Sequence, residues 1–307
     1  MENDIHSAAV AGRALVFGGS GQIGEPLLAQ LLAAGWAVTA VSRQAHVDTP
    51  GVHWVQADLY GFWRDGQAFD AVISCGPLDN FVRWYAGSDI RSPRVVAFGS
   101  TSAEVKQDSA EPAERDVARR LREAEQLLFA TAAERGVAAT VLRPTLIYGA
   151  GRDKTLTSIA RMAKRTRLLV LPSCAKGLRQ PVHVQDLAKA VLQVLPAAVS
   201  HGQAYAVGGG EVLPYNQMVR RVLATLQPRP LLLRVPTPLF VWALRKAHGK
   251  GRLLGMNEAV LERMRDPLAF DIEPARRDFG YAPRAFQVQE GMFVGAGENV
   301  DEALPEH

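Results

Sequence analysis

Seven residues near the start of the chain have the composition of a phosphate-binding turn. The segment Gly18-Gly-Ser-Gly21-Gln-Ile-Gly24 follows an apolar run at residues 13–17 and precedes a helical pattern at residues 25–34. Glycines let a backbone turn tightly and approach a pyrophosphate, while free amides and the dipole of the following helix stabilise its charge. The pattern predicts a dinucleotide-binding loop formed by Gly18, Ser20, Gly21, Gln22, Ile23 and Gly24. The flanking strand and helix disfavour the alternative, a surface turn without a ligand.

The end of the expected second strand indicates which dinucleotide would bind. An apolar run at residues 37–41 is followed by Ser42-Arg43-Gln44, without an acidic residue. An NAD-selective site places an acid here to bind the ribose 2′-hydroxyl, whereas an arginine accommodates the 2′-phosphate of NADP. The Arg43 guanidinium and the Ser42 hydroxyl suit a phosphate, so we expect NADP(H) in preference to NAD(H). In the alternative interpretation, Arg43 is one of many solvated arginines.

Further segments extend this pattern along the chain. They are Val55-Gln-Ala-Asp58-Leu59, Ser74-Cys75-Gly76, Phe98-Gly-Ser100-Thr101-Ser102 and Leu142-Arg-Pro144-Thr-Leu-Ile-Tyr148-Gly149. With these motifs, residues 13–290 resemble the extended short-chain dehydrogenase/reductases, the NAD-dependent epimerase/dehydratase group. The resemblance implies an adenine contact at Asp58 and Leu59, a small-residue turn at Ser74, Cys75 and Gly76, a catalytic hydroxyl at Ser100 or Thr101, and a nicotinamide-side segment with Pro144 and Tyr148.

A narrower resemblance concerns residues 168–188. The run Leu-Leu-Val-Leu-Pro and the later Gln180-Pro-Val-His183-Val-Gln-Asp186 resemble the atypical branch that includes the accessory Rossmann subunit of respiratory complex I.

The family's proton-transfer pair, a tyrosine with a lysine four residues later, has no counterpart in the chain. At that spacing the six tyrosines are followed by Arg64, Asp89, Arg152, Gly209, Val219 and Ala285. Aligning Ala124-Glu125 with the Ala-Glu that usually follows the family's lysine puts Val117 at the tyrosine position and Leu121 at the lysine position. The lysine normally lowers the phenol pKa, so two apolar residues there make the standard mechanism unavailable. Sliding the helix by one residue brings Arg120 or Arg122 near the lysine position, without a phenol beside them.

The candidate replacements are three hydroxyls and one histidine. Ser100, Thr101 and Tyr148 would orient a substrate rather than protonate it, because a hydroxyl of ordinary pKa is a poor general acid near neutral pH. His183 titrates in the useful range. For His183 we favour a packing role before a helix at residues 187–195 whose N-cap is Asp186.

Apolar runs and helical patterns alternate from residue 13 onward, as in successive β-α-β units. We expect about eight parallel strands, including residues 13–17, 37–41, 52–57, 71–74, 94–98, 138–142 and 203–207. A long helix at residues 113–135 would bury one apolar stripe of Val117, Leu121, Ala124, Leu127 and Leu128. Residues 77–93 leave room for one short helix, which leaves the oligomeric state open because the family usually dimerises there. The alternation is expected to stop after Gly210.

These elements predict an α/β fold, a doubly wound parallel Rossmann sheet with a small C-terminal substrate lobe. The sheet domain would comprise residues 1–150 and 177–210, and the lobe would comprise residues 151–176 and 211–295. Residues 296–307 would form a tail.

Composition excludes several classes of protein. The chain has 307 residues, 48% hydrophobic and 21% charged, as in a globular domain rather than a disordered or fibrous one. A formal net charge of +4 is smaller than is usual for a surface that binds nucleic acid, so we expect no nucleic-acid partner. Cys75 and Cys174 show no metal-binding or disulfide spacing, so no metal site is predicted.

Two features bear on location. The start of the chain lacks the basic and apolar regions of a signal peptide, and no run reaches the roughly 20 apolar residues of a spanning helix, so a cytoplasmic protein is expected. Residues 228–254 combine prolines, an apolar run and basic residues, as in helices that lie on a membrane surface. We favour a helix of the lid or substrate lobe instead.

Two functions remain open from the sequence. The first is an NADP(H)-dependent oxidoreductase or epimerase-like enzyme with an altered proton donor and a small-molecule substrate. The second is a catalytically silent NADPH-binding protein with a structural or sensing role, which the missing tyrosine favours.

Overall fold

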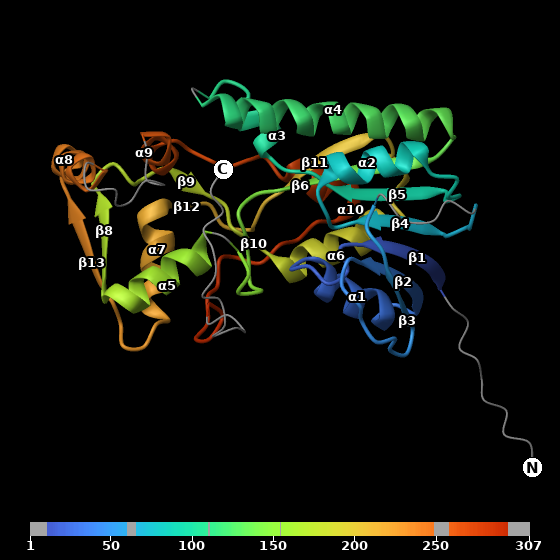
Figure 1. Ribbon diagram of the computed structural model, residues 1–307, viewed down its shortest axis with the longest axis horizontal. Coiled ribbons are helices and arrows are strands. Elements are labelled where there is room, and N and C mark those ends of the chain that lie inside the picture. Colours follow the sequence, from blue (N-terminus) through green and yellow to red (C-terminus); the bar gives the residue numbers. More distant parts are fainter. Residues whose placement is uncertain (1–10, 60–65, 110, 154, 249–257, 294–307) are drawn as a thin grey trace, which may run out of the picture. The chain divides into compact units, whose positions relative to one another are not determined.

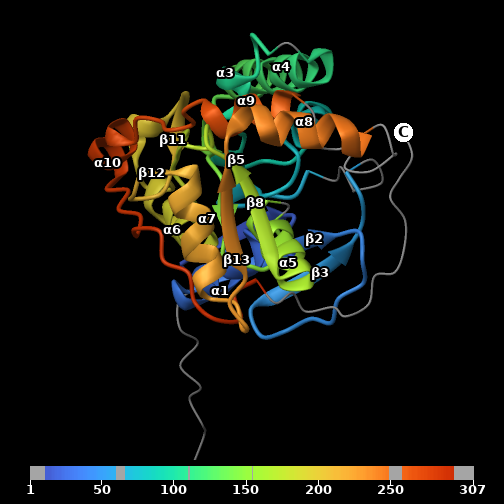
Figure 2. The same cartoon turned by 90° about the vertical axis from the view of Figure 1, so that its left-hand side faces the viewer.

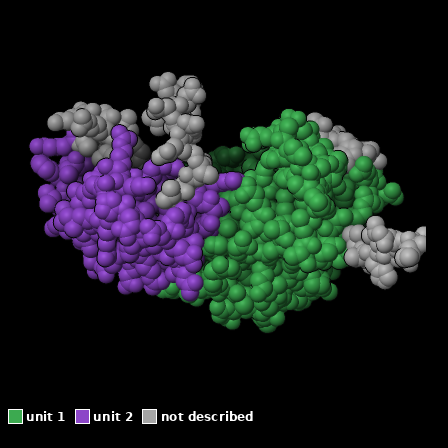
Figure 3. Space-filling model, turned by 90° about the horizontal axis from the view of Figure 1, so that it is seen from below, with its two compact units in different colours: residues 1–145, 180–211, 268–285 green, residues 146–179, 212–267, 286–307 purple. Residues whose placement is uncertain are grey.

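The computed structural model describes residues 11–59, 66–109, 111–153, 155–248 and 258–293. The chain divides into two compact units (Figure 3). Unit 1 comprises residues 1–145, 180–211 and 268–285, and unit 2 comprises residues 146–179, 212–267 and 286–307.

A parallel sheet forms the centre of unit 1. Its strands are β1 (Gly12–Phe17), β2 (Trp36–Ser42), β3 (Val52–Gln56), β4 (Ala71–Ser74), β5 (Arg94–Phe98), β6 (Ala138–Pro144) and β11 (Gln203–Val207). The order is β11-β6-β5-β4-β1-β2-β3, so the strand order reverses between β1 and β4. In doubly wound sheets a ligand binds at the carboxyl ends of the strands beside this reversal. The predicted fold class is confirmed, although the sheet has 7 strands rather than about eight.

Helices cover both faces of this sheet (Figure 1). Helices α1 (Gly24–Ala33) and α6 (Val184–Val194) lie on one face, and α2 (Leu78–Gly87) and α4 (Pro112–Glu134) lie on the other. Because both faces are covered, the strands are largely apolar, and β4 and β5 are buried at every position. The short helix expected before β5 is α2, and its Phe81, Trp84 and Tyr85 are core residues.

The buried face of α4 differs from the predicted stripe. Ala124 and Leu128 of the stripe are buried as predicted, but Leu127 is 42% exposed. Ala118 and Glu125, which lie outside the stripe, are buried. The helix is therefore rotated relative to the stripe, and it carries a carboxylate into the interior. Glu125 is buried because Arg143 of β6 pairs with it, an interaction that hydrophobic periodicity does not reveal.

Two other expectations for unit 1 are corrected. Helix α6 is capped by His183, whose ring accepts a hydrogen bond from the backbone N–H of Gln185, and not by Asp186. Residues 268–285 belong to unit 1 rather than to the C-terminal lobe. They include α10 (Glu273–Phe279), and they are tied to unit 1 by the Arg284–Asp186 ion pair and by the Tyr281 hydroxyl, which donates to Gly208 O. The unit also contains α3 (Ser102–Val105), η1 (Ala198–Ser200) and β10 (Val182–His183).

Unit 2 continues the helix and strand alternation after Gly210, contrary to expectation. Its main elements are α5 (Leu156–Thr166), β8 (Leu168–Pro172), α7 (Tyr215–Ala224), β13 (Leu231–Val235), α8 (Thr237–His248) and α9 (Glu258–Arg265). The parallel partner of β13 is β8, so the later strand builds a separate two-stranded sheet. The shorter strands are β7 (Ile147–Tyr148), β9 (Leu178–Arg179) and β12 (Leu213–Pro214), and β9 pairs antiparallel with β12. No helix in the described residues is long and apolar enough to cross a membrane.

Candidate functional site

The glycine loop lies between the carboxyl end of β1 and the first turn of α1, as predicted. Gly18 has a φ of 74°, a left-handed conformation that glycine adopts without strain. The Gly21 N–H donates to Gly18 O at 3.0 Å, and the Gly21 carbonyl accepts from the Glu25 N–H at 3.0 Å. The loop therefore folds back on itself and leads directly into the helix N-terminus.

Two glycines of the loop are required for different reasons. A Cβ on Gly24 would lie 2.1 Å from Gly18 O and 2.6 Å from Gly19 Cα, so α1 can approach the loop only through a glycine. A Cβ on Gly21 would meet only Gly18 O, at 3.1 Å, and would otherwise project into open space. Gly24 thus serves helix packing, whereas Gly21 leaves room where a pyrophosphate would approach the backbone.

The turn after β4 lies against this loop. Strands β1 and β4 place Phe17 opposite Ser74, and a Cβ on Gly18 would be 3.1 Å from Gly76 N. A Cβ on Gly76 would meet no atom within 4 Å, so the space beside this turn is open. Burial raises the pKa of the Cys75 thiol to about 12, which keeps it protonated at neutral pH. The predicted small-residue turn therefore borders the phosphate loop with an uncharged surface.

Two buried polar atoms in this region have no protein partner among the described residues. They are Gln22 Oε1 in the loop and Ser74 Oγ at the end of β4. Buried polar atoms normally have partners, so each position suits a group supplied by a ligand or by water. Together with the open space at Gly21 and Gly76, they make this part of unit 1 fit a dinucleotide.

The end of β2 joins the same site. Ser20 Oγ and Ser42 Oγ are 3.3 Å apart, which links the glycine loop to the second strand. Arg43 is exposed, and no side chain of the described residues pairs with its guanidinium. Asp58 and Leu59 follow directly after β3, where the Ala57 N–H donates to Ser42 O at 2.9 Å.

Sequence reasoning missed His46 at this point. Its Nε2 lies 3.1 Å from Ser42 Oγ, and its ring stacks on Trp54 with centroids 4.2 Å apart. Trp54 comes from β3, the next strand along the chain, and its ring holds the imidazole beside Ser42. The spacing Ser-Arg-x-x-His was visible, but a lone histidine in a polar loop has no signal of its own. Ser42, Arg43 and His46 bring a hydroxyl, a guanidinium and an imidazole to one strand end.

A second group of candidate residues lies at the ends of β5 and β6. The Thr101 hydroxyl donates to Pro144 O at 3.2 Å, and the Thr101 N–H donates to the same carbonyl at 3.3 Å. Ser100 is half-buried, and its Oγ accepts the Ser102 N–H at 3.1 Å. Thr101 therefore binds the two strand ends together, whereas the Ser100 O–H remains able to donate to a substrate.

The position of α4 is set by the Glu125–Arg143 pair. Arg143 Nε is 2.8 Å from Glu125 Oε1, Arg143 Nη2 contacts Glu125 Oε2, and Arg143 Nη1 is 2.6 Å from Glu104 Oε1. A Cβ on Gly99 would lie 3.1 Å from Glu125 Oε1, so Glu125 is level with the end of β5. At 1.5 Å per residue, Leu121 and Val117 lie about 6 Å and 12 Å further toward the helix N-terminus.

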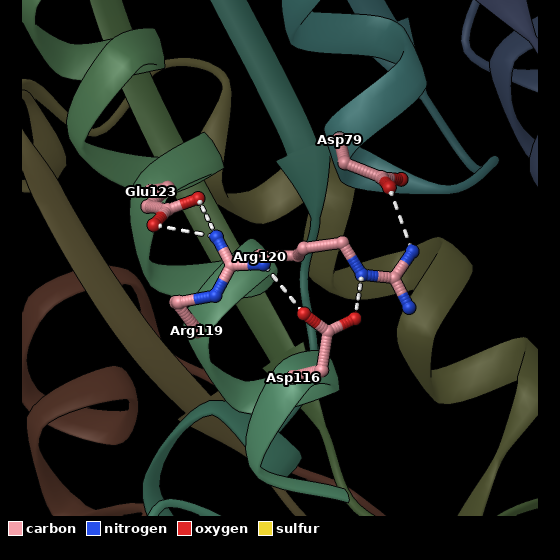
Figure 4. A network of polar contacts seen from close by, with 5 residues as sticks. All are labelled: Asp79, Asp116, Arg119, Arg120 and Glu123. Carbon is pink, nitrogen blue, oxygen red and sulfur yellow. Dashed lines mark hydrogen bonds and ion pairs between the residues drawn. The ribbon is translucent and has the colours of Figure 1, made fainter. Parts of the chain in front are cut away.

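These two apolar residues occupy half-buried positions on the helix, and Leu121 packs against the core. The neighbouring arginines are engaged elsewhere. Arg120 contacts Asp116 at 2.9 Å and Asp79 of α2 at 3.5 Å, while Arg119 contacts Asp116 and Glu123 (Figure 4). Arg122 contacts Gln107 Oε1 at 2.8 Å. The side chains of Arg120 and Arg122, the candidates for the lysine position, therefore bind other residues of unit 1.

The remaining two candidates have packing roles in the structure. His183 is 8% exposed, and burial together with the nearby Arg284 charge lowers its pKa, which favours the neutral ring that caps α6. Tyr148 belongs to unit 2, where it is fully buried beside Phe286 with ring centroids 4.9 Å apart. Its hydroxyl accepts the Gln287 N–H at 3.3 Å.

Comparison with known proteins identifies part of the chain. Residues 91–208 match the model of the NAD dependent epimerase/dehydratase family. A 2-alkyl-3-oxoalkanoate reductase of Stenotrophomonas maltophilia is 29% identical over 182 residues, 55% of this chain and 53% of that protein. A UDP-glucose 4-epimerase of Vibrio cholerae is 25% identical over 170 residues, 55% of this chain and 49% of that protein. The chain thus spans about half the length of the curated relatives it matches.

Solved structures share the fold over most of the chain. An epimerase from Methanothermobacter thermautotrophicus superposes with a TM-score of 0.66 at 15% identity, covering 92% of this chain and 90% of that one. UDP-glucuronic acid 4-epimerase from Bacillus cereus in complex with NAD gives 0.66 at 11% identity, covering 89% and 94%. The chain therefore has the Rossmann-like fold of the epimerases, and its residues 91–208 match the NAD-dependent epimerase/dehydratase family.

Proposed function

We propose that the whole chain is a member of the epimerase/dehydratase family that binds NADPH and reduces a carbonyl group on a small molecule. The observation that carries the cofactor assignment is the cluster of Ser42, Arg43 and His46 at the end of β2. An arginine fork and a hydroxyl suit the doubly charged 2′-phosphate of NADPH, whereas no carboxylate follows β2 directly to bind a ribose diol. Asp48, further along the loop, is occupied by His53 at 2.7 Å and by the Trp54 N–H.

The cofactor would lie along the carboxyl edge of the unit 1 sheet. Its pyrophosphate would approach Gly21 and the N-terminus of α1, and its adenine end would lie toward Asp58 and Leu59. Ser74, Cys75 and Gly76 would border its phosphates, and Pro144 would lie on the nicotinamide side. The nicotinamide supplies the hydride when the cofactor is bound.

The proton step differs from that of the family because Val117 and Leu121 carry no titratable group. The Ser100 hydroxyl would donate a hydrogen bond to the substrate carbonyl oxygen, where negative charge develops as hydride arrives at the carbon. Thr101 would be a positioning residue, since its hydroxyl is committed to Pro144 O. Water would then donate a proton to the alkoxide. Because no titratable pair is available to move this proton in both directions, the reaction would be a reduction rather than a rapid reversible epimerisation.

A second candidate function is a catalytically silent NADPH-binding protein. The apolar pair Val117 and Leu121 favours it, because positioned acid–base catalysis typically contributes about 10²–10⁴-fold. The resemblance of residues 168–188 to the branch that includes the accessory subunit of complex I also favours this second candidate.

An assay of NADPH oxidation across ketones, aldehydes, 2-alkyl-3-oxoalkanoates and nucleotide sugars decides between the candidates. We expect slow reduction of one carbonyl class that falls about tenfold or more in Ser100→Ala, while the control Ser158→Ala, an exposed serine of unit 2, retains it. A V117Y/L121K variant restores the usual pair and should raise turnover by about 10²-fold or more.

Absence of turnover in the wild type and in V117Y/L121K, with tight NADPH binding retained, would support the silent binder and contradict the reductase. Fast epimerisation of nucleotide sugars by the wild type would show that α4 has been assigned incorrectly.

A further inference from the structure

The two-stranded sheet of unit 2 is apolar on both faces, and among the described residues only one face packs into a core. Leu169 and Leu171 of β8 and Leu232 of β13 pack into a core with residues of α5 and α7. Side chains alternate across a strand, so Leu168, Val170, Leu231 and Leu233 project to the other side. The register pairs Leu231 with Leu168 and Leu233 with Val170, which places all four on one surface, termed here the outer face.

The outer face is unusually exposed for its composition. Leu231 is 65% exposed, Leu233 is 45% exposed and Leu168 is 38% exposed. Sheets that are apolar on both sides normally bury both of them. An apolar surface of neighbouring leucines without a cover marks a site of interaction.

Helix α8 continues this surface. Figure 2 shows β8 and β13 side by side, with α8 across one end of them. The helix begins at Thr237, whose hydroxyl lies 3.1 Å from Ser173 Oγ just after β8, so the strand end holds the helix start. Leu239 and Trp242 are 51% and 55% exposed, and Lys246 Nζ lies 4.4 Å from the centre of the Trp242 ring. Tryptophan and lysine on one helical stripe are typical of segments that lie at a membrane interface.

The segments that carry these apolar residues have charges of a single sign. Residues 155–179 and 212–248, the part of unit 2 that contains β8, β13 and α8, include no aspartate or glutamate. Their basic residues are Arg161, Lys164, Arg165, Arg167, Lys176, Arg179, Arg220, Arg221, Arg229, Arg234, Arg245 and Lys246. The net charge of +4 for the whole chain conceals this segregation.

A basic hollow adjoins the outer face at the start of β13. It has a volume of about 420 Å³ and is lined by Arg220, Leu223, Arg229, Pro230, Leu231, Leu232 and Arg234. Leu231 thus belongs both to the apolar face and to a pocket with three arginines. Phosphate oxygens are strong acceptors for guanidinium groups, and the hollow is large enough for a lipid headgroup.

We propose that the outer face and α8 dock unit 2 onto a bilayer that contains anionic lipid. The leucines and Trp242 would enter the boundary between headgroups and acyl chains, while the arginines and Lys246 would contact lipid phosphates. A second copy of the chain fits less well, because the same face of the partner is equally basic. Nucleic acid would use the arginines but would give no role to the exposed leucines. This proposal does not depend on the catalytic role of unit 1.

Vesicle flotation of the full chain tests the proposal. We expect the protein to float with phosphatidylcholine vesicles that contain phosphatidylglycerol, to float poorly with phosphatidylcholine alone, and to be released by salt. R229S/R234S should weaken partitioning about 30-fold, which corresponds to ~1 kcal/mol for each charge near the surface. The control R83S/K189S, two exposed positions of unit 1 with the same change in net charge, should leave it unchanged.

The apolar contribution has its own matched pair of variants. L231S should weaken partitioning about tenfold, whereas V199S, in which a 58% exposed residue of unit 1 is changed, should not. Because both positions are exposed, neither variant should unfold the chain. Quenching of Trp242 fluorescence by brominated acyl chains, absent in Trp242→Phe, would place α8 at the lipid boundary.

Several results would overturn the proposal. One is equal flotation with neutral and anionic vesicles. Another is a loss of partitioning in R83S/K189S or V199S as large as that in R229S/R234S or L231S. A third is a dimer that sedimentation experiments detect in the wild type and not in L231S, together with no vesicle binding by the wild type. This result would assign the outer face to a second copy of the chain. A fourth is binding to a duplex oligonucleotide that R229S/R234S abolishes and L231S leaves intact, without vesicle binding.

Discussion

At the residue scale, neighbouring residues of similar chemistry have different partners in the structure. Ser100 and Thr101 are adjacent and chemically alike, yet Thr101 donates its proton to Pro144 O while Ser100 accepts a backbone N–H. Near the start of α6, Asp186 was expected to be the cap and His183 a packing residue, and the structure differs for both. His183 caps the helix, and Asp186 pairs with Arg284 at 3.0 Å. Thr101 and Pro144 are 43 residues apart and Asp186 and Arg284 are 98 residues apart, so local sequence does not reveal these pairings.

The pH dependence of stability provides a test of the His183 cap. Burial and the Arg284 charge lower the pKa of His183 in the folded chain, so the folded state favours the neutral ring. Its stabilising contribution is fully present above the unfolded pKa of about 6.5 and is lost as pH falls through the lowered folded pKa. Asparagine also caps helices but does not titrate in this range.

The measurement is the free energy of unfolding in denaturant at about pH 7.5 and about pH 5.5. We expect the wild type to lose more stability than His183→Asn between these two values. An equal loss in both proteins would mean that His183 is not held neutral in the folded chain.

At the element scale, the glycine loop and the sheet were predictable because their signals are local. Short stretches of sequence predict the strand before the loop and the helix after it. They also predict the apolar runs that form β1 to β6 and β11. The position of α4 was not predictable, because it is set by Glu125 and Arg143, which pair across 18 residues of sequence. Removing one partner of such a buried pair typically costs about 3–5 kcal/mol, because the other charge is left without a counter-ion.

The loop glycines provide a prediction at the same scale. Gly24→Ala should destabilise the chain, toward the upper end of the ~1–3 kcal/mol expected for overpacking, because the new Cβ would overlap Gly18 O. Gly21→Ala should leave stability nearly unchanged and weaken NADPH binding about tenfold or more, because its Cβ enters the space for the pyrophosphate.

Thermal unfolding and a binding titration of both variants check this division. Strong NADPH binding in Gly21→Ala would show that the loop does not hold the pyrophosphate. Unchanged stability in Gly24→Ala would show that α1 does not pack closely on the loop.

At the scale of the whole molecule, charge and apolar surface are distributed unevenly between the two units. The glycine loop, the β2 end and Ser100 all lie in unit 1, whereas the acid-free basic segments and the exposed leucines lie in unit 2. Sequence composition averages over these differences, so residues 228–254 gave no indication that Leu231 and Trp242 are 65% and 55% exposed. Residues 268–285 were likewise assigned to the lobe, because their contacts with Tyr205 and Asp186 are long-range.

The central proposal is that unit 1 is selective for NADPH, and calorimetric titration measures this selectivity directly. Wild-type protein and Arg43→Ala would each be titrated with NADPH and NADH, with Arg83→Ala, an exposed arginine of α2, as the control. We predict that the wild type binds NADPH more tightly and that Arg43→Ala loses ~1.5–3 kcal/mol for NADPH but little for NADH. Equal losses for the two cofactors, or tighter binding of NADH by the wild type, would contradict the assignment.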